Sequence, residues 1–361
     1  MLFGGDTHGA GSPVVNSTWQ WNGQTWSELT PVTSPPPRYG AAMAFDSATN
    51  QLVLFGGYDP TDSPLSDTWI WDGTNWAKAA PPASPEARWG ASMTYDAATH
   101  ELVLFGGCCT GDSFLQDTWT WDGTTWTQLS PSTSPPPREF AAFGFDATEG
   151  TPVLFGGDTN SGGTGVLGDT WVWTGDTWSE ESPVTSPSGR ASASLAADSN
   201  GALVLFGGTN ASFSAAYSDT WVWTGTDWQQ EAPLTPPPGR YGEGFAADST
   251  SGQVLLFGGL DQGSDFLADT WSFAGQTEPT TTTSTTTSST VAAPLASTTS
   301  TVSGPLSRAS SSLAFTGTGT TLRWTAVLGI CLVLLALVLF GLSGHRTFRS
   351  VGRCQPPPWK E

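Results

Sequence analysis

A motif of about 50 residues repeats along the first three quarters of this chain and limits its possible folds more than any other feature. Leu-Phe-Gly-Gly occurs six times, with its Phe residues 52, 50, 50, 51 and 51 positions apart. Those residues are Phe3, Phe55, Phe105, Phe155, Phe206 and Phe257. Self-similarity at such a period is typical of repeat architectures, in which each repeat packs against its neighbours.

Three further landmarks keep the same period. The first is Asp-Thr-Trp-x-Trp, found at 67–71, 117–121, 169–173 and 219–223, with weaker versions at 17–21 and 269–273. The second is a later Trp: Trp26, Trp76, Trp126, Trp178 and Trp228. The third is an Arg after a Pro-rich stretch: Arg38, Arg88, Arg138, Arg190 and Arg240. Six copies in one register predict six structural units of one kind.

Each repeat is predicted to form four short strands, here called a to d. In the second repeat, strand a covers residues 38–46, strand b 52–55 and strand c 68–71, and strand d begins near Trp76. The Asp72-Gly73 pair between strands c and d predicts a tight hairpin, since Gly accepts a positive φ. The Arg and the Asp open strands a and c at the same end, so we expect structural pairs such as Arg38 with Asp67.

Strands b and c carry large apolar residues in both alternations, which indicates that both of their faces are buried. Four-stranded sheets packed face to face around an axis are the blades of a β-propeller. A parallel β-helix is the alternative, but its rungs are about half this length. The sequence therefore predicts an all-β, six-bladed propeller.

The first and last blades are expected to be incomplete. Met1 directly precedes the first Leu-Phe-Gly-Gly, so the first repeat begins at strand b, and the last repeat stops after strand c at Phe273. We expect an upstream segment with a signal peptide to supply the missing strand d of the last blade and strand a of the first.

The Gly-Gly after strand b, the aromatic strand c and the Trp of strand d resemble the kelch repeat over residues 1–275. The resemblance implies a propeller with a binding surface, as in the central domain of galactose oxidase. A copper site like that of galactose oxidase requires converging His, Tyr and Cys ligands, and the chain has only His8, His100 and His345. We therefore expect no cofactor and no metal.

The charge of the repeats excludes nucleic acid and anionic lipid as their partners. The whole chain carries a net charge of −20, and residues 1–278 hold 31 Asp and Glu against 6 Lys and Arg. Such a surface repels polyanions. The adjacent Cys108 and Cys109 form either a strained disulfide or two free thiols.

The C-terminal quarter is predicted to attach the repeats to a cell. Residues 276–312 are rich in Thr and Ser and are expected to form a disordered stalk. Residues 324–342 are apolar over a length that spans a bilayer. The basic tail at 343–361 predicts a cytoplasmic C-terminus and a propeller outside the cell.

A short motif between the stalk and the apolar run resembles the cell-wall sorting signal of Gram-positive bacteria. Its residues are Leu313, Ala314, Phe315, Thr316 and Gly317. The resemblance implies that sortase cuts after Thr316 and joins it to the cell wall. Ala314 replaces the usual Pro and the basic tail is longer than usual, so a plain membrane anchor is the open alternative.

Function is expected on the face that carries the b–c loops. The d–a loops on that face are alike and Pro-rich, and we interpret them as spacers, whereas the b–c loops differ from one another. Their aromatic residues are candidates for contact with a protein or a glycan: Tyr58, Phe114, Phe213, Tyr217 and Phe266. The competing interpretation is that these side chains only cap the blades.

No catalytic motif is evident, so the preferred function is a non-catalytic binding protein on the cell surface. Two alternatives stay open: a carbohydrate-active or oxidase-type propeller enzyme, and a structural protein of the cell wall. Aspartates in the b–c loops, among them Asp59 and Asp261, have no recognised calcium-binding spacing and are interpreted as solvated.

Overall fold

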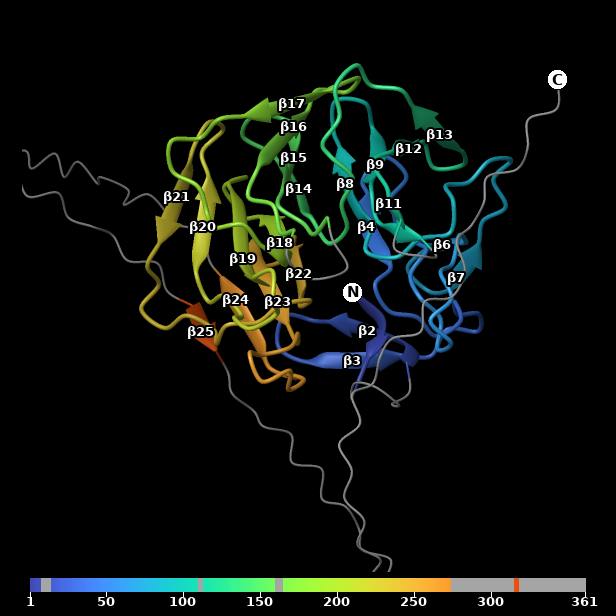
Figure 1. Cartoon of the computed structure of the whole chain (residues 1–361). Helices are drawn as coiled ribbons and strands as arrows, with labels where there is room; N and C mark the ends of the chain where they lie inside the picture. Colours follow the sequence, from blue (N-terminus) through green and yellow to red (C-terminus); the bar gives the residue numbers. More distant parts are fainter. Residues whose placement is uncertain (8–13, 110–112, 160–164, 274–314, 318–361) are drawn as a thin grey trace, which may run out of the picture.

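The computed structural model describes residues 1–7, 14–109, 113–159, 165–273 and 315–317 of the 361 residues. This part of the chain forms strands and turns, with no helix. Apart from one two-stranded hairpin, the strands make six sheets that follow one another around a ring in chain order (Figure 1). The predicted six-bladed propeller is confirmed.

Each blade is an antiparallel sheet whose strands follow the chain from the innermost strand to the outermost. Blade 1 contains β1 (Leu2–Asp6), β2 (Val14–Trp21) and β3 (Trp26–Leu29). Blade 2 contains β4 (Ala42–Asp46), β5 (Gln51–Phe55), β6 (Thr68–Trp71) and β7 (Trp76–Lys78). Blade 3 contains β8 (Ser92–Asp96), β9 (Glu101–Phe105), β12 (Thr118–Trp121) and β13 (Trp126–Leu129). Blade 4 contains β14 (Ala142–Asp146), β15 (Thr151–Phe155), β16 (Thr170–Trp173) and β17 (Trp178–Glu181). Blade 5 contains β18 (Ala191–Ala197), β19 (Leu203–Thr209), β20 (Thr220–Trp223) and β21 (Trp228–Glu231). Blade 6 contains β22 (Gly244–Asp248), β23 (Gln253–Phe257), β24 (Thr270–Phe273) and β25 (Phe315–Gly317). A hairpin of β10 (Cys108–Cys109) and β11 (Ser113–Phe114) lies in the b–c loop of blade 3.

The core lies between neighbouring blades, as the two-sided burial of strand b requires. Val53, Leu54 and Phe55 of β5 are each at most 1% exposed although they alternate between the two faces of the sheet. Phe55 contacts Trp126 of the next blade edge to face, with ring centroids 5.2 Å apart. The same aromatic pair joins Phe105 to Trp178, so one sequence pattern builds successive interfaces.

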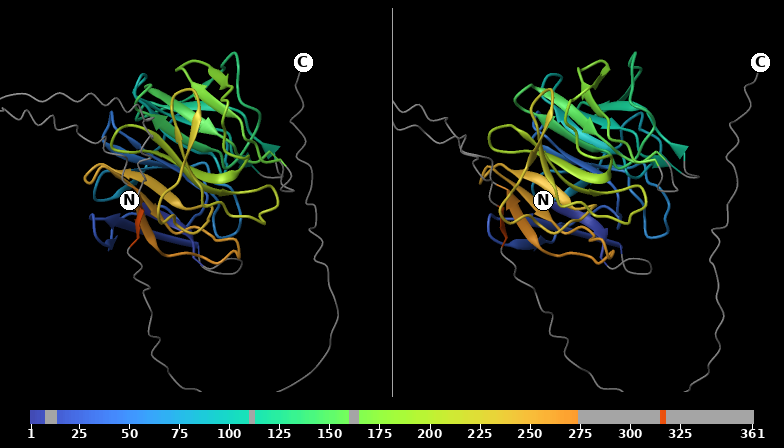
Figure 2. Two further views of the ribbon diagram at one scale, coloured as in Figure 1. Left: turned by 90° about the vertical axis from the view of Figure 1, so that its left-hand side faces the viewer. Right: turned by 60° about the vertical axis from the view of Figure 1, so that its left-hand side comes forward.

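A hydrogen bond between an indole and a hydroxyl also crosses these interfaces. In each case the Trp that opens strand d donates from Nε1 to the Thr Oγ1 in strand c of the preceding blade. The pairs are Trp76–Thr18, Trp126–Thr68, Trp178–Thr118, Trp228–Thr170 and Trp26–Thr270, at 2.8 to 3.0 Å. The last pair joins blade 1 to blade 6 and closes the ring, and these two blades are adjacent in both side views (Figure 2).

The predicted Arg–Asp pairs are present in blades 2 to 6. The guanidinium of Arg38 donates to both oxygens of Asp67, at 2.6 and 3.0 Å, and to the carbonyl of Gly56 at 3.0 Å. The four equivalent pairs are Arg88–Asp117, Arg138–Asp169, Arg190–Asp219 and Arg240–Asp269. Each Arg side chain is fully buried, so these residues fix the blade end that carries the b–c loops.

The two end blades differ from the others in opposite ways. Blade 1 contains three strands in the described part of the chain, and Ser17 takes the place of the Asp by accepting a hydrogen bond from Trp19 Nε1. The expectation that blade 6 ends at its third strand is corrected, because β25 pairs with β24 through Phe273 and Phe315. Without a fourth strand, the outer edge of β24 would leave its backbone donors and acceptors unpaired. A segment from the C-terminal region, β25, pairs with this edge.

The predicted membrane segment at 324–342 lies outside the described residues, as do the stalk at 276–312 and the first two residues of the sorting motif, Leu313 and Ala314. The backbone of the other three, Phe315 to Gly317, forms β25. Within the residues that the structure describes, no helix is long and apolar enough to cross a membrane.

Candidate functional site

The buried arginines place one residue of each blade beside the first residue of a b–c loop. The residue after the Arg exchanges two backbone hydrogen bonds with this loop residue, as Tyr39 does with Tyr58 at 3.0 and 2.8 Å. We call these pairs the mouth positions. They are Tyr39–Tyr58, Trp89–Cys108, Glu139–Asp158, Ala191–Thr209 and Tyr241–Leu260.

A chain of backbone hydrogen bonds links the mouth positions of neighbouring blades. The next residue in each blade has a positive φ: Gly40, Gly90, Phe140, Ser192 and Gly242. The amides of the last four donate to the carbonyl of the equivalent residue in the preceding blade, from Gly90 onto Gly40 through to Gly242 onto Ser192, at 2.8 to 3.0 Å. Because strand a is the innermost strand, this chain of bonds runs beside the central axis from blade 2 to blade 6 and links the mouth positions of these five blades.

The mouth positions differ in chemistry from blade to blade although the frame around them repeats. Blade 2 carries two Tyr, blade 3 carries Trp and Cys, blade 4 carries Glu and Asp, blade 5 carries Ala and Thr, and blade 6 carries Tyr and Leu. Residues that carry the fold are the same in each repeat, as the arginines are. Side chains that change on a constant frame are where recognition is usually found.

The aromatic side chains of blades 2 to 4 form a continuous group that we call the aromatic sector. Tyr58 stacks on Trp89, with ring centroids 4.4 Å apart and planes 14° from parallel. Tyr39 packs edge to face on both, and Phe140 packs edge to face on Trp89 at 4.8 Å. All four side chains are partly exposed. The indole Nε1 of Trp89 is buried and has no hydrogen-bond partner among the described residues.

Carboxylates border the aromatic sector. The Tyr39 hydroxyl donates to Asp62 Oδ1 at 2.6 Å, and burial together with this carboxylate raises the pKa of Tyr39. Glu139 and Asp158 are 8% and 4% exposed and share a backbone bridge, which places both side chains on one side of the ribbon. A Cβ on Gly90 would lie 3.3 Å from Glu139 Oε2, so the Glu139 carboxylate lies beside the residue that follows Trp89.

A second, smaller aromatic group lies on blades 5 and 6. Phe213 is 46% exposed, has a positive φ of 52°, and contacts Tyr241 with ring centroids 6.0 Å apart. The Arg190 guanidinium lies 4.2 Å from the ring centre of Tyr217 in a cation–π contact. Tyr217 therefore supports a structural Arg–Asp pair.

The five predicted binding residues thus fall into different settings. Tyr58 belongs to the aromatic sector, Phe213 to the second group, and Tyr217 packs on Arg190. Phe114 and Phe266 pair through their backbones with Cys108 and Leu260 in their own loops. A role of these five residues in ligand binding stays a prediction.

Sequence analysis missed Tyr39, Trp89 and Phe140, because they follow the Pro-rich d–a loops that were interpreted as spacers. One signal was available. The residue after each Arg is Tyr, Trp, Glu, Ala or Tyr, whereas the Arg itself never changes.

The b–c loops of blades 2, 5 and 6 share a local turn. Asp59, Asn210 and Asp261 each accept backbone N–H bonds from residues two to five positions further on. Such turns stabilise the loop without a metal ion. No group of three or more His, Cys, Asp or Glu side chains suited to a metal occurs in the described part of the chain.

No disulfide joins the two adjacent cysteines. Cys108 is buried, whereas Cys109 is partly exposed. Burial and the negative charge of Glu86 raise the pKa of the Cys109 thiol, so this thiol is not activated as a nucleophile.

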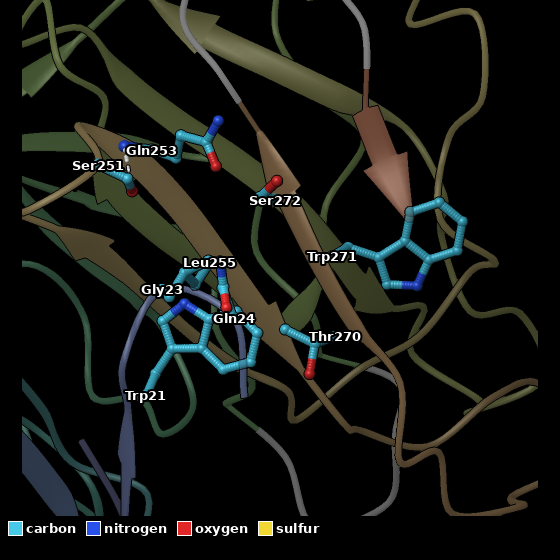
Figure 3. A pocket seen from close by; sticks show the side chains of 9 residues that line it. All are labelled: Trp21, Gly23, Gln24, Ser251, Gln253, Leu255, Thr270, Trp271 and Ser272. Atoms are coloured by element: carbon cyan, nitrogen blue, oxygen red, sulfur yellow. Dashed lines mark hydrogen bonds between the residues drawn. The ribbon is translucent and has the colours of Figure 1, made fainter. Parts of the chain in front are cut away.

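A hollow of about 270 Å³ lies between blades 6 and 1, among the c–d turn of blade 1 and strands β23 and β24. Its lining residues are Trp21, Gly23, Gln24, Ser251, Gln253, Leu255, Thr270, Trp271 and Ser272. Figure 3 shows Trp21 beside Gln24 and Leu255, while the Trp271 ring extends away from them. Ser272 stands where blades 2, 4 and 5 have Ile70, Val172 and Val222, so a smaller side chain leaves the interface less filled here.

Comparison with known proteins agrees with this architecture. The family profile described as "KLHDC2/KLHL20/DRC7 Kelch-repeats domain" matches residues 1–142 and 76–230. A solved structure described as "Structure of YjhT" is similar with a TM-score of 0.56 and 17% identity, covering 72% of this chain and 89% of that one. At this identity the likeness concerns the fold alone. No curated protein matches the chain in sequence.

Proposed function

This chain belongs to the kelch-repeat family, and from that membership we propose that it is a non-catalytic binding protein whose contact surface is the face that carries the mouth positions. Its ligand is a protein or a glycan outside the cell. The structural frame is the same in successive blades of the propeller. A ligand can therefore distinguish one side of the mouth from another only through the residues that differ between blades.

One observation carries the proposal: the variable residues of different blades meet in a single aromatic surface. Tyr58 and Trp89 are 31 positions apart and come from blades 2 and 3, yet their rings stack at 4.4 Å. Aromatic side chains provide large contact area at low entropic cost, and they are enriched where proteins bind partners. The four residues of the aromatic sector, Tyr39, Tyr58, Trp89 and Phe140, lie outside the repeated frame of Arg, Asp, Thr and Trp.

The test is a binding screen of the full chain, purified in detergent, on glycan and peptide arrays. Trp89→Ala should remove binding to the selected ligands, because it takes away the central ring of the sector. Trp21→Ala is the matched control, since Trp21 is a partly exposed indole beside a c–d turn, at the opposite end of the blades. Ligands that bind wild type and both variants equally would contradict the proposal.

We further propose that the propeller is displayed on a cell surface and attached to the cell wall or the membrane through its C-terminal region. The support is the order of the Thr/Ser-rich segment, the sorting-type motif, the apolar run and the basic tail in the sequence. If sortase joins Thr316 to the wall, wild type should remain on wall fragments after detergent extraction, whereas Thr316→Ala should be extracted. Equal extraction of both proteins would leave the plain membrane anchor.

A further inference from the structure

We infer that the aromatic sector binds a basic segment of a protein partner, with a Lys or Arg side chain over the rings and between the carboxylates. This inference deepens the proposed function and rests on it, because it names the chemistry of the ligand at that same surface.

The charges of the molecule favour a cationic ligand over an anionic one. Residues 1–278 contain six Lys and Arg, and five of these are the buried arginines that pair with Asp. The sixth, Lys78, is 61% exposed and lies 4.0 Å from Asp67. The mouth therefore presents no unneutralised cation to an acidic ligand, while the net charge of −25 on residues 1–278 (31 Asp and Glu minus six Lys and Arg) draws cations toward the domain.

The local geometry places carboxylates next to the rings. Asp62 lies at one side of the sector, held by the Tyr39 hydroxyl at 2.6 Å. Glu139 lies at the other side, where its carboxylate is close to Gly90, the residue after Trp89. An ammonium or guanidinium group over an aromatic face gains from the ring quadrupole, and flanking carboxylates add a direct charge attraction.

The extent of the sector suits a peptide better than a bare cation. The rings of Tyr39, Tyr58, Trp89 and Phe140 form a continuous, partly exposed surface across blades 2 to 4. One Lys or Arg side chain covers only part of such a surface, and the neighbouring residues of a peptide would contact the rest. A basic segment therefore matches the rings and the carboxylates together.

The experiment measures the anisotropy of a labelled heptapeptide in which Gly and Lys alternate, titrated with the full chain at 50 and 300 mM NaCl. Two matched peptides carry acetyl-lysine or Glu in place of Lys. We expect the Lys peptide to bind, more weakly at the higher salt, and the other two to bind at least ten-fold more weakly. Equal binding of the acetyl-lysine peptide would overturn the inference, since acetylation removes the charge and keeps the backbone.

Variants then locate the site. Trp89→Leu and Tyr58→Leu should each weaken binding of the Lys peptide about ten-fold, and Asp62→Asn about three-fold. Glu28→Gln is the control for charge alone, because Glu28 is exposed on the outer strand β3, and it should leave the affinity within a factor of two. A loss with Glu28→Gln equal to that of Asp62→Asn would show diffuse attraction to the whole domain and would overturn the site.

The same variants separate this inference from the proposed function. If the Lys peptide fails to bind but Trp89→Leu weakens a neutral glycan such as chitotetraose, the basic partner is wrong and the binding surface stands. If neither Trp89→Leu nor Tyr58→Leu changes the binding of any probe, both proposals fail. Melting temperatures and near-ultraviolet circular dichroism confirm that each variant is folded, and two independent ring variants guard against loss of one to misfolding.

Discussion

At the scale of single residues, the buried arginines are expected to be the most sensitive to substitution. Each guanidinium makes hydrogen bonds to a carboxylate and to two backbone carbonyls in a fully buried position, as Arg138 does with Asp169, Gly156 and Pro136. Removing one partner of a buried ion pair leaves a charge without compensation, which costs about 3–5 kcal/mol.

We therefore expect Arg138→Met to lower the free energy of unfolding by about 3–5 kcal/mol in urea denaturation. Lys78→Met is the control, because this exposed side chain only approaches Asp67 at 4.0 Å, and it should change stability by less than about 1 kcal/mol. Similar effects of the two substitutions would show that the buried pair does not anchor the blade.

The same pairs predict sensitivity to acid. Burial disfavours the charged form of Asp169, but the hydrogen bonds and charge of Arg138 outweigh burial and hold the pKa of Asp169 below its ordinary value. A carboxyl whose pKa is lower in the folded state stabilises the protein above its unfolded pKa of about 4. That contribution is lost as the pH falls further, so the melting temperature should decrease steeply below about pH 4.

Glu243 behaves in the opposite way. It is 8% exposed, its two carboxylate oxygens have no hydrogen-bond partner among the described residues, and burial raises its pKa to about 8 despite the charge of Arg240. A carboxyl with a raised folded pKa destabilises the protein as the pH rises from its unfolded value through about 8.

Glu243→Ala should therefore raise the melting temperature at pH 9 and much less at pH 5. Alanine fits this position, since the equivalent residues of other blades are Ala41, Ala91, Ala141 and Ala193. Melting curves from pH 5 to 9 provide the measurement. If the melting temperatures of wild type and variant change with pH in the same way, burial of Glu243 does not disfavour its charged form and the prediction is wrong.

At the scale of elements, blade 6 lacks one bond that five interfaces share. Thr220 of β20 is the hydroxyl that a strand-d Trp of blade 6 would meet, and its Oγ1 is buried without a partner in the described part of the chain. The backbone of Phe315 in β25 pairs with Phe273, which is the register position that Trp76 takes opposite Trp71 in blade 2.

Phe315→Trp should add the missing indole–hydroxyl bond and stabilise the protein by about 1 kcal/mol, or about 2 °C in melting temperature. Thr220→Val is the matched partner substitution. It should be nearly neutral alone and should cancel the gain when combined with Phe315→Trp. A gain that persists in the double variant would come from apolar packing instead.

At the scale of the whole molecule, one interface between the first and last blades keeps the ring closed. At this interface Trp26 donates a hydrogen bond to Thr270 and contacts Phe257, with ring centroids 5.2 Å apart. This interface also contains the hollow of about 270 Å³ beside Ser272. It is therefore expected to be the least stable junction of the ring.

Trp26→Ala should open this junction locally. Hydrogen exchange should become faster in β1 to β3 and in β22 to β24, while blades 3 and 4 keep their protection. Trp126→Ala is the control at an interior interface, where faster exchange should centre on blades 2 and 3 instead. Uniform acceleration in both variants would show that the propeller opens only as one cooperative unit.

The sequence by itself determined the features that each repeat contains within its own 50 residues. Strand b is buried on both faces because its residues are apolar in both alternations, and the c–d turn follows from Asp72-Gly73, where Gly73 has a φ of 103°. The Arg38–Asp67 pair was predictable because both residues open strands at the same end of one blade. Such local relations do not depend on where the blade lies in the ring.

Only the tertiary structure decided which residues of different blades meet. Tyr58 and Trp89 stack because an aligned ring brings the ends of two blades together, and no local pattern in the sequence encodes that contact. The pairing of β25 with β24 joins segments more than 40 residues apart through backbone groups that any sequence can provide. The burial of Glu243 likewise depends on the neighbouring blade. The sequence shows only that Glu243 stands where other blades have Ala, and this difference does not predict its raised pKa.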